Sequence, residues 1–230
     1  GLMDLMAPEL RKRATQLLRH NLTGLLEGAL RTSNAQFMQT DILDRVGVKL
    51  EDAKPGDIGW DIFLLDFNVD PPISAIVPES AMIKYRKAFK MLWRLKRTEW
   101  TLSASWKRLL VFSHSRGALE HCKKLKKVFH RCSLNRARMS HVVATLNTYM
   151  MFEVLESEWQ ALEGKLKDSV SKSLDGIVDA HDRYLDNILQ RALLTTVHEP
   201  LHAQLQSMLD SIIRFCNQED TLVADAIAAL

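Results

Sequence analysis

The sequence has few features of a membrane or secreted protein. Its longest uninterrupted apolar runs, IFLL and AIAAL, are far shorter than the roughly 18 residues that a membrane-spanning helix needs. No basic segment followed by a long apolar segment opens the chain, so we expect no secretory signal. The first residue is Gly1 rather than methionine, which suggests that the natural protein extends further toward its N-terminus. We predict no membrane partner.

Cysteine is also scarce. The chain has only Cys122, Cys132 and Cys216, an odd number without CxxC spacing, which favours a reducing compartment such as the cytoplasm over a disulfide-bonded fold. His121 and His130 lie near two of these cysteines, but the spacing matches no zinc signature and nearby lysines and arginines would repel a cation. The sequence predicts no metal site and no cofactor.

Motifs of known catalytic sites are missing. The sequence contains no glycine-rich phosphate loop, no GxSxG elbow and no HExxH pair. His181 and Asp182 lie together on one predicted helix, but capping or ion pairing explains them better than general-base catalysis, which needs a defined pocket. We therefore predict no catalytic residue and no enzymatic activity.

The charges of the chain are unevenly distributed. The 230 residues carry a net charge of +3 and are 47% hydrophobic, enough to form a globular domain, which we predict to span residues 1–230. Residues 84–138 contain 17 lysines and arginines against only Glu99 and Glu120, an excess of 15 positive charges, whereas the remainder has an excess of 12 negative charges. Such a segment either attracts an anionic partner or is neutralised by the acidic segments of the chain.

Three kinds of anionic partner fit the basic segment: a nucleic acid, a membrane surface and an acidic protein. In KYRKAFKMLWRLKRTEW the aromatic residues fall at helical spacing and are expected in the core, which leaves lysine and arginine without the stacking platforms of a base reader. A basic amphipathic helix inside a bundle has already buried its apolar face, which argues against a membrane. An acidic protein is favoured. A basic module that binds nucleic acid and a helical scaffold that binds a coiled-coil protein remain as alternatives.

Most of the chain has helical periodicity. Apolar residues recur at spacings of three and four residues, which indicates amphipathic helices. The predicted helices span residues 8–35, the segment from Pro78 to a break near Gly117, and residues 118–156, 157–172, 174–194 and 200–227. These elements predict a mainly α fold, an antiparallel helical bundle.

One stretch has the pattern of strands. In VGVKLEDAKPGDIGWDIFLLDFNVDPP, a short alternating run is followed by a turn rich in proline and glycine and by a second alternating run, Trp60–Val69. Pro71 and Pro72 end the second run, because proline cannot donate a hydrogen bond to a sheet. This pattern predicts a small β-hairpin near residues 46–70.

Five collinear stretches resemble one family. They are RHNLTGLLEGALRTSNAQF, PGDIGWDIFLLDFNVDPPISAIV, YRKAFKMLWRLKRTEWTLSASW, YMMFEVLESEW and IVDAHDRYLDNILQRALL. Together they resemble the C-terminal domain of the gamma-tubulin complex proteins, the Spc97/Spc98 family, and the first two are most similar to its third-component subtype. The resemblance runs in order from about residue 19 to the end of the chain.

The resemblance implies a fragment of a gamma-tubulin complex subunit whose N-terminal half is absent. In that family the N-terminal half contacts neighbouring subunits of the complex, whereas the C-terminal half binds the gamma-tubulin that templates microtubules. It implies a location in the cytoplasm and cytoskeleton, at the microtubule-organising centre (the centrosome or spindle pole body). Gamma-tubulin is an acidic protein, so it would suit the basic segment. The family has no catalytic residues.

The resemblance also suggests candidate residues for binding gamma-tubulin. The first motif is rich in side chains with directional hydrogen bonds, and an arginine in it could bind a carboxylate through both arms of its guanidinium. The candidates in the first two motifs are His20, Asn21, Arg31, Asn34, Phe37, Asp61, Phe67 and Asp70. A second group, in the basic segment, comprises Lys84, Lys87, Arg94 and Lys96. These residues either contact the partner or fasten the hairpin to the first long helix.

Overall fold

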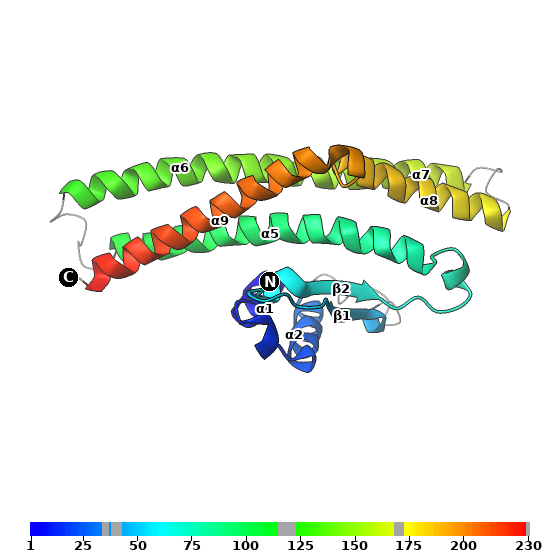
Figure 1. Ribbon diagram of the computed structural model, residues 1–230, viewed down its shortest axis with the longest axis horizontal. Coiled ribbons are helices and arrows are strands. Elements are labelled where there is room, and N and C mark those ends of the chain that lie inside the picture. The colour runs from blue at the N-terminus through cyan, green and yellow to red at the C-terminus, as the bar shows by residue number, and fades with distance from the viewer. Residues whose placement is uncertain (34–36, 38–42, 115–122, 168–172, 229–230) are drawn as a thin grey trace. The chain divides into compact units, whose positions relative to one another are not determined.

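The computed structural model forms two compact units. It describes residues 1–33, 37, 43–114, 123–167 and 173–228. Unit 1 comprises Gly1–Lys90 and Gln160–Asn187, and unit 2 comprises Met91–Trp159 and Ile188–Leu230. The boundaries between the units fall inside helices rather than in loops. The elements are labelled in Figure 1.

Unit 1 combines short helices with the hairpin. Its elements in chain order are α1 (Leu2–Leu10), η1 (Ala14–Gln16), α2 (Arg19–Arg31), β1 (Val46–Leu50), α4 (Gly59–Ile62), β2 (Phe63–Phe67), η3 (Ile73–Ala75), the start of α5 (Glu79–His114), most of α7 (Ser157–Lys167) and most of α8 (Leu174–Arg191). Its core includes Leu10, Leu22, Val48 and Phe63, none of them more than 2% exposed. The ring of Phe63 lies 6.3 Å from that of Phe89 on α5.

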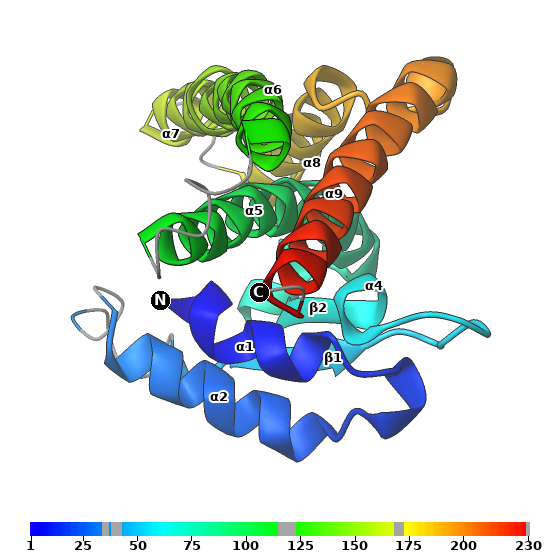
Figure 2. The ribbon, with the colours of Figure 1, turned by 90° about the vertical axis from the view of Figure 1, so that its left-hand side faces the viewer.

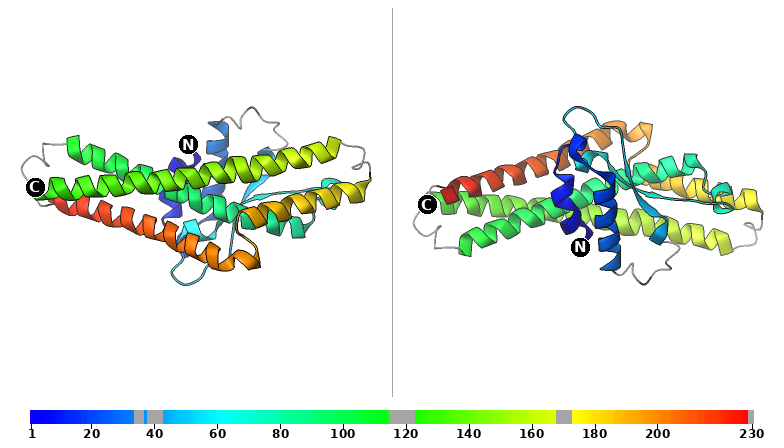
Figure 3. Two further views of the ribbon diagram at one scale, coloured as in Figure 1. Left: turned by 90° about the horizontal axis from the view of Figure 1, so that it is seen from above. Right: turned by 90° about the horizontal axis from the view of Figure 1, so that it is seen from below.

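Unit 2 is built on long helices. It contains the rest of α5, α6 (Lys123–Thr148), the π-helical segment η4 (Tyr149–Glu156), η6 (Thr196–His198) and α9 (Glu199–Ala228). Within this unit α5 and α9 run in the same direction and α6 runs opposite to both (Figure 3). Phe112 and Phe129 join α5 to α6, with ring centroids 5.6 Å apart. The predicted mainly α fold with a small hairpin is confirmed.

The hairpin near residues 46–70 is also confirmed. Strands β1 and β2 are antiparallel, with Val46 opposite Phe67 and Leu50 opposite Phe63. The backbone pairing continues past both ends, because Glu51 donates its N–H to Ile62 and Asn68 donates its N–H to Arg45, each at 2.9 Å.

The second strand is shorter than predicted. Residues Gly59–Ile62 form the short helix α4 instead of the beginning of a strand. Asp61 stabilises this turn, because its carboxylate accepts the backbone N–H of Ile58 at 3.2 Å and its own N–H donates to the Ile58 carbonyl at 2.9 Å. The turn buries both Trp60 and Ile62.

The prediction of one helix over residues 8–35 is wrong. The structure has α1, the short η1 and α2 in its place, and Pro8 lies inside α1 rather than at its start. Between the helices, Gly59 donates its N–H to Lys12 and Ala14 donates its N–H to Asp57, each at 3.0 Å. Pairing with the hairpin loop therefore replaces the helical hydrogen bonds of this segment.

The predicted helix boundary between residues 156 and 157 is also wrong. The helical backbone continues from α6 through the π-helical segment η4 into α7, and both Thr148 and Ser157, which flank η4, have helical dihedral angles. A π-helical turn holds one extra residue, so it shifts the apolar periodicity without breaking the helix. In the sequence alone, such a shift in periodicity looks like the end of one helix and the start of another.

A polar cluster joins α5 to α8 within unit 1. The hydroxyl of Tyr85 and Nε2 of His181 are 2.9 Å apart, and Nζ of Lys84 lies 2.6 Å from a carboxylate oxygen of both Asp182 and Asp186. Burial raises the pKa of Tyr85 to about 12. Burial also lowers the pKa of His181, as does the Lys84 ammonium, while the Asp182 carboxylate acts in the opposite direction.

We expect His181 to make unit 1 less stable in acid. Its pKa in the folded chain is below the ordinary value of about 6.5, so the unfolded chain binds the proton first. The contribution of His181 to stability is therefore complete above about pH 6.5 and is lost as the pH falls from there through the folded-state pKa. Urea unfolding between pH 7.5 and pH 5 measures this slope. His181→Gln should flatten it, whereas His141→Gln, at an exposed position on α6, should not. Equal slopes for the two variants would contradict the assignment.

Candidate partner-binding surface

The open end of the hairpin brings together polar groups from both strands. Beyond the last cross-strand pair, Nη1 of Arg45 lies 3.5 Å from Oδ2 of Asp70. The side-chain amide of Asn68 donates to Oδ1 of Asp70 at 3.4 Å. Asp70, a candidate from the sequence, is exposed and already has an arginine beside it.

An apolar hollow of about 420 Å³ lies between the hairpin and the start of α5. Val46 and Phe67 from the strands, Ile73 from η3 and Met82 from α5 are among its lining residues. Phe67 is 38% exposed and Ile73 is 51% exposed. Large apolar side chains left open at the rim of a hollow are typical of a protein-binding surface.

A second, polar hollow of about 460 Å³ lies beside the first. Arg86 lines both hollows, and its guanidinium donates through Nε and Nη2 to the two carboxylate oxygens of Asp66, at 3.0 and 3.2 Å. The same guanidinium lies 2.6 Å from Glu79. These hydrogen bonds raise the pKa of Arg86. This two-armed pair fastens β2 to α5 and so holds the floor of the surface in place.

Arg31 lines a third hollow, of about 590 Å³, at the C-terminal end of α2. Helix α2 lies along β1 (Figure 2), and Arg19 on its first turn donates from Nε to the carbonyl of Val48 at 3.0 Å. Val46 lines both this hollow and the apolar one. We call this region the hairpin-end surface and define it as Arg31, Arg45, Val46, Phe67, Asp70 and Ile73.

Of the other candidates in the first two motifs, His20, Asn21 and Asp61 do not line these three hollows. His20 and Asn21 are exposed on the first turn of α2, and Asp61 caps α4 at the opposite end of the hairpin. Phe37 is 82% exposed. Asn34 lies outside the described residues. The hydrogen bond between the Asp61 carboxylate and the backbone N–H of Ile58 stabilises the fold of this turn.

The candidates of the basic segment already interact with carboxylates of the chain, with the exception of the exposed Lys87. Lys84 binds Asp182 and Asp186 in unit 1, as described above. In unit 2, Arg94 pairs with Asp210, and Lys96 lies 2.9 Å from Glu99. The chain therefore neutralises part of its own positive excess, and Arg94 and Lys96 do not belong to the hairpin-end surface.

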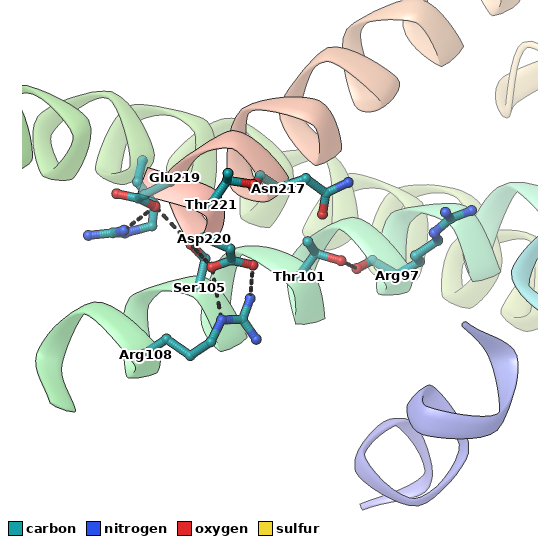
Figure 4. A network of polar contacts seen from close by, with 9 residues as sticks. Arg97, Thr101, Ser105, Arg108, Asn217, Glu219, Asp220 and Thr221 are labelled. Carbon is teal, nitrogen blue, oxygen red and sulfur yellow. Dashed lines mark hydrogen bonds and ion pairs between the residues drawn. The ribbon is translucent and has the colours of Figure 1, made fainter. Parts of the chain in front are cut away.

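Unit 2 contains a buried charge network that joins its three long helices (Figure 4). The Ser105 hydroxyl donates to Oε2 of Glu219 at 2.8 Å, and Nη1 of Arg136 donates to the same oxygen at 2.5 Å. Next to them Arg108 binds both carboxylate oxygens of Asp220. Arg136 and Glu219 are only 4% and 3% exposed. Because the pair lies in the interior, its role is to fix helix packing rather than to contact a partner.

Three residues of the hairpin-end surface, Arg45, Val46 and Ile73, were not among the sequence candidates. Ile73 directly follows Pro71 and Pro72, and a large apolar residue just after a double proline was a signal for an exposed side chain in a turn. Arg45 precedes the first strand, and its meeting with Asp70 follows once the register of the hairpin is known. No signal in the sequence predicts the register of the two strands with an accuracy of one residue.

In the described ranges, no group of three or more histidine, cysteine, aspartate or glutamate side chains is placed to hold a metal ion. None of the helices in the same ranges is both long and apolar enough to cross a membrane.

Comparison with known proteins identifies relatives along the whole chain. The family model described as gamma tubulin complex component C-terminal matches residues 1–229. The chain is 41% identical to gamma-tubulin complex component 3 homolog of Xenopus laevis and 39% identical to gamma-tubulin complex component 3 of Homo sapiens, each over 231 residues that cover 100% of this chain and 25% of the relative. It is 34% identical over 218 residues to spindle pole body component alp6 of Schizosaccharomyces pombe, covering 93% of this chain and 26% of that protein. The chain thus spans about a quarter of the length of these relatives.

Proposed function

The chain belongs to the family of gamma-tubulin complex components, and from this premise we propose that it binds gamma-tubulin through the hairpin-end surface. In this role it acts within a larger subunit, beside other subunits of a gamma-tubulin complex, in the nucleation of microtubules. Relatives named as spindle pole body components favour a site of action at a microtubule-organising centre. The proposed role is one of assembly and not of catalysis.

One observation supports this surface above others in unit 1. Phe67 and Ile73 are exposed at the rim of an apolar hollow, and Arg31 and Arg45 line two further hollows that each share residues with it. An apolar centre with arginines at its border is the usual composition of a protein–protein contact. The arginines suit an acidic partner such as a tubulin, because a guanidinium can bind a carboxylate through two hydrogen bonds.

The proposal predicts a large effect of two apolar substitutions. In interferometry of the 230-residue chain against purified gamma-tubulin at about 150 mM salt, Phe67→Ala combined with Ile73→Ser should raise Kd roughly tenfold or more. Arg31→Ala should raise it by a smaller factor, since exposed charges are partly screened at this ionic strength. Circular dichroism shows whether each variant is folded.

The matched control is Val197→Ser, which removes an 82% exposed apolar side chain from unit 2. It should bind like the parent chain. Folded Phe67 and Ile73 variants that bind gamma-tubulin as tightly as the parent would place the interface elsewhere. A folded parent chain that does not bind gamma-tubulin at all would contradict the proposed function itself.

A further inference from the structure

The positive excess of residues 84–138 divides into two parts in the structure. In one part, cations bind carboxylates from other segments of their own unit. These cations are Lys84, Arg86, Lys90, Arg94, Arg108 and Arg136. Their charge is neutralised within the fold, so it is not available to attract a partner.

The other part includes exposed cations of α6. This helix of 26 residues contains no aspartate or glutamate. Lys127, Arg131 and Arg138 are exposed, and no ion pair joins them to a carboxylate among the described residues. Because they are spaced by four and seven residues, they lie on one face of the helix. This face therefore carries positive charge that the described part of the fold does not neutralise.

The same face also carries apolar side chains. Leu134 is 50% exposed and Val142 is 42% exposed, and both fall within the helical spacing of the three cations. The opposite face of α6 is the packed one, since Phe129 and Val143 are buried there at 3% and 0% exposure. We call the exposed face the outer α6 stripe and define it as Lys127, Arg131, Leu134, Arg138 and Val142.

We propose that the outer α6 stripe docks an acidic amphipathic helix of a second partner protein. Carboxylates of that helix face Lys127, Arg131 and Arg138, and its aliphatic side chains cover Leu134 and Val142. The stripe spans about 22 Å at 1.5 Å per residue, the length of a four-turn helix. Its spacing of four, three, four and four residues is the one that a second helix matches with its own turns.

The two exposed apolar residues of the stripe, Leu134 and Val142, favour a protein over a nucleic acid as its partner. Phosphates would neutralise the three cations but would leave Leu134 and Val142 in water, whereas a helix can cover both kinds of side chain. The stripe belongs to unit 2 and the hairpin-end surface to unit 1, and the partner inferred here is a protein other than gamma-tubulin.

The test uses a labelled synthetic helical peptide as the probe. One face carries glutamate opposite Lys127, Arg131 and Arg138, and leucine opposite Leu134 and Val142. Fluorescence anisotropy at about 150 mM salt should show saturable binding to the 230-residue chain. Arg131→Glu combined with Arg138→Glu should weaken it roughly tenfold or more, because like charges then face each other. A second peptide with lysine in place of glutamate should bind this variant and not the parent chain.

The control variant has the same change in net charge at another place. Lys165→Glu combined with Arg183→Glu alters two exposed cations of unit 1 and should leave peptide binding unchanged. Equal weakening by the control, or equal binding of a peptide with the same composition in scrambled order, would reduce the effect to net charge and overturn the proposal. Absence of peptide binding would also overturn it.

Two further outcomes separate this inference from other partners. If an RNA duplex binds the stripe more tightly than the peptide at the same salt concentration, the proposal is overturned. The partner of the stripe is then a nucleic acid and not an acidic helix. Gamma-tubulin binding should be unaffected by Arg131→Glu with Arg138→Glu. If that variant loses gamma-tubulin and Phe67→Ala does not, the stripe is the gamma-tubulin contact and no second partner is needed.

Discussion

Arg136→Met is expected to lower the free energy of unfolding by about 3–5 kcal/mol. Its guanidinium is the only cation within ion-pair distance of Glu219 among the described residues, and both side chains are buried. In the variant the Glu219 carboxylate keeps the Ser105 hydroxyl at 2.8 Å, but its second oxygen, Oε1, is buried and has no hydrogen-bond partner even in the parent chain. A buried carboxylate without its cation is costly, because it has lost its hydration and gained no compensating charge. Urea unfolding followed by circular dichroism measures the loss.

Arg138→Met is the matched control for this prediction. It removes an arginine two residues away on the same helix, but from an exposed position on the outer α6 stripe, and it should change the free energy of unfolding by no more than about 0.5 kcal/mol. Replacing both members of the buried pair, with Arg136→Met and Glu219→Leu, should recover much of the stability, since neither side chain is then charged. If Arg136→Met costs no more than Arg138→Met, the buried pair does not hold the helices together.

Gly59→Ala should destabilise unit 1 by about 1–3 kcal/mol. A Cβ atom at this position would lie 2.8 Å from Cα of Leu10, 2.9 Å from its carbonyl oxygen and 2.8 Å from Cδ1 of Leu17. Two of these atoms belong to the backbone at the end of α1, so a side-chain rotation cannot relieve the contact. The chain between α1 and α2 must shift away from the hairpin, and its hydrogen bonds to Gly59 and Asp57 are strained.

Gly24→Ala, also in unit 1, is expected to raise the stability instead of lowering it. Gly24 lies inside α2, and a Cβ atom there would meet nothing within 4 Å. Alanine costs less than glycine in a helix interior, so this variant should be more stable by about 0.5–1 kcal/mol. Thermal unfolding of both variants beside the parent chain measures the two shifts. Equal effects of the two substitutions would show that the fit of Gly59 against Leu10 does not matter.

The helical fold and the hairpin could be predicted because each leaves a local pattern in the sequence. Apolar residues at spacings of three and four marked α5, α8 and α9, and alternation with bounding prolines marked the hairpin. The pattern failed where a tertiary contact overrides it. Leu10 and Leu17 are seven residues apart, as on one helix face, yet they come together at Gly59 from the end of α1 and from the extended segment before α2.

The charge pairs could not be predicted from local patterns. Arg136 and Glu219 are separated by 83 residues, and nothing in the sequence near either one indicates the other. The same holds for Lys84, whose carboxylate partners are on α8. An excess of 15 positive charges in one segment therefore did not show which cations are neutralised internally and which, as on α6, stay exposed.

The contact of the candidate residues with gamma-tubulin stays a prediction, as does the single domain over residues 1–230. Arg31 and Phe67 line hollows in unit 1, and Asp70 lies beside Arg45 at the open end of the hairpin. Asp61 is an example of a motif residue that stabilises the fold, because its carboxylate caps α4. A motif that recurs at a binding surface contains residues that hold the fold as well as residues that face the partner.

Hydrogen–deuterium exchange of the chain with and without gamma-tubulin tests the proposed interface most directly. With saturating gamma-tubulin, amide exchange should slow in residues 43–50 and 63–77 and at the C-terminal end of α2, where the hairpin-end surface lies. Exchange on the outer α6 stripe should stay unchanged. Slower exchange confined to α6, or no change in the hairpin although gamma-tubulin is bound, would contradict the proposed interface.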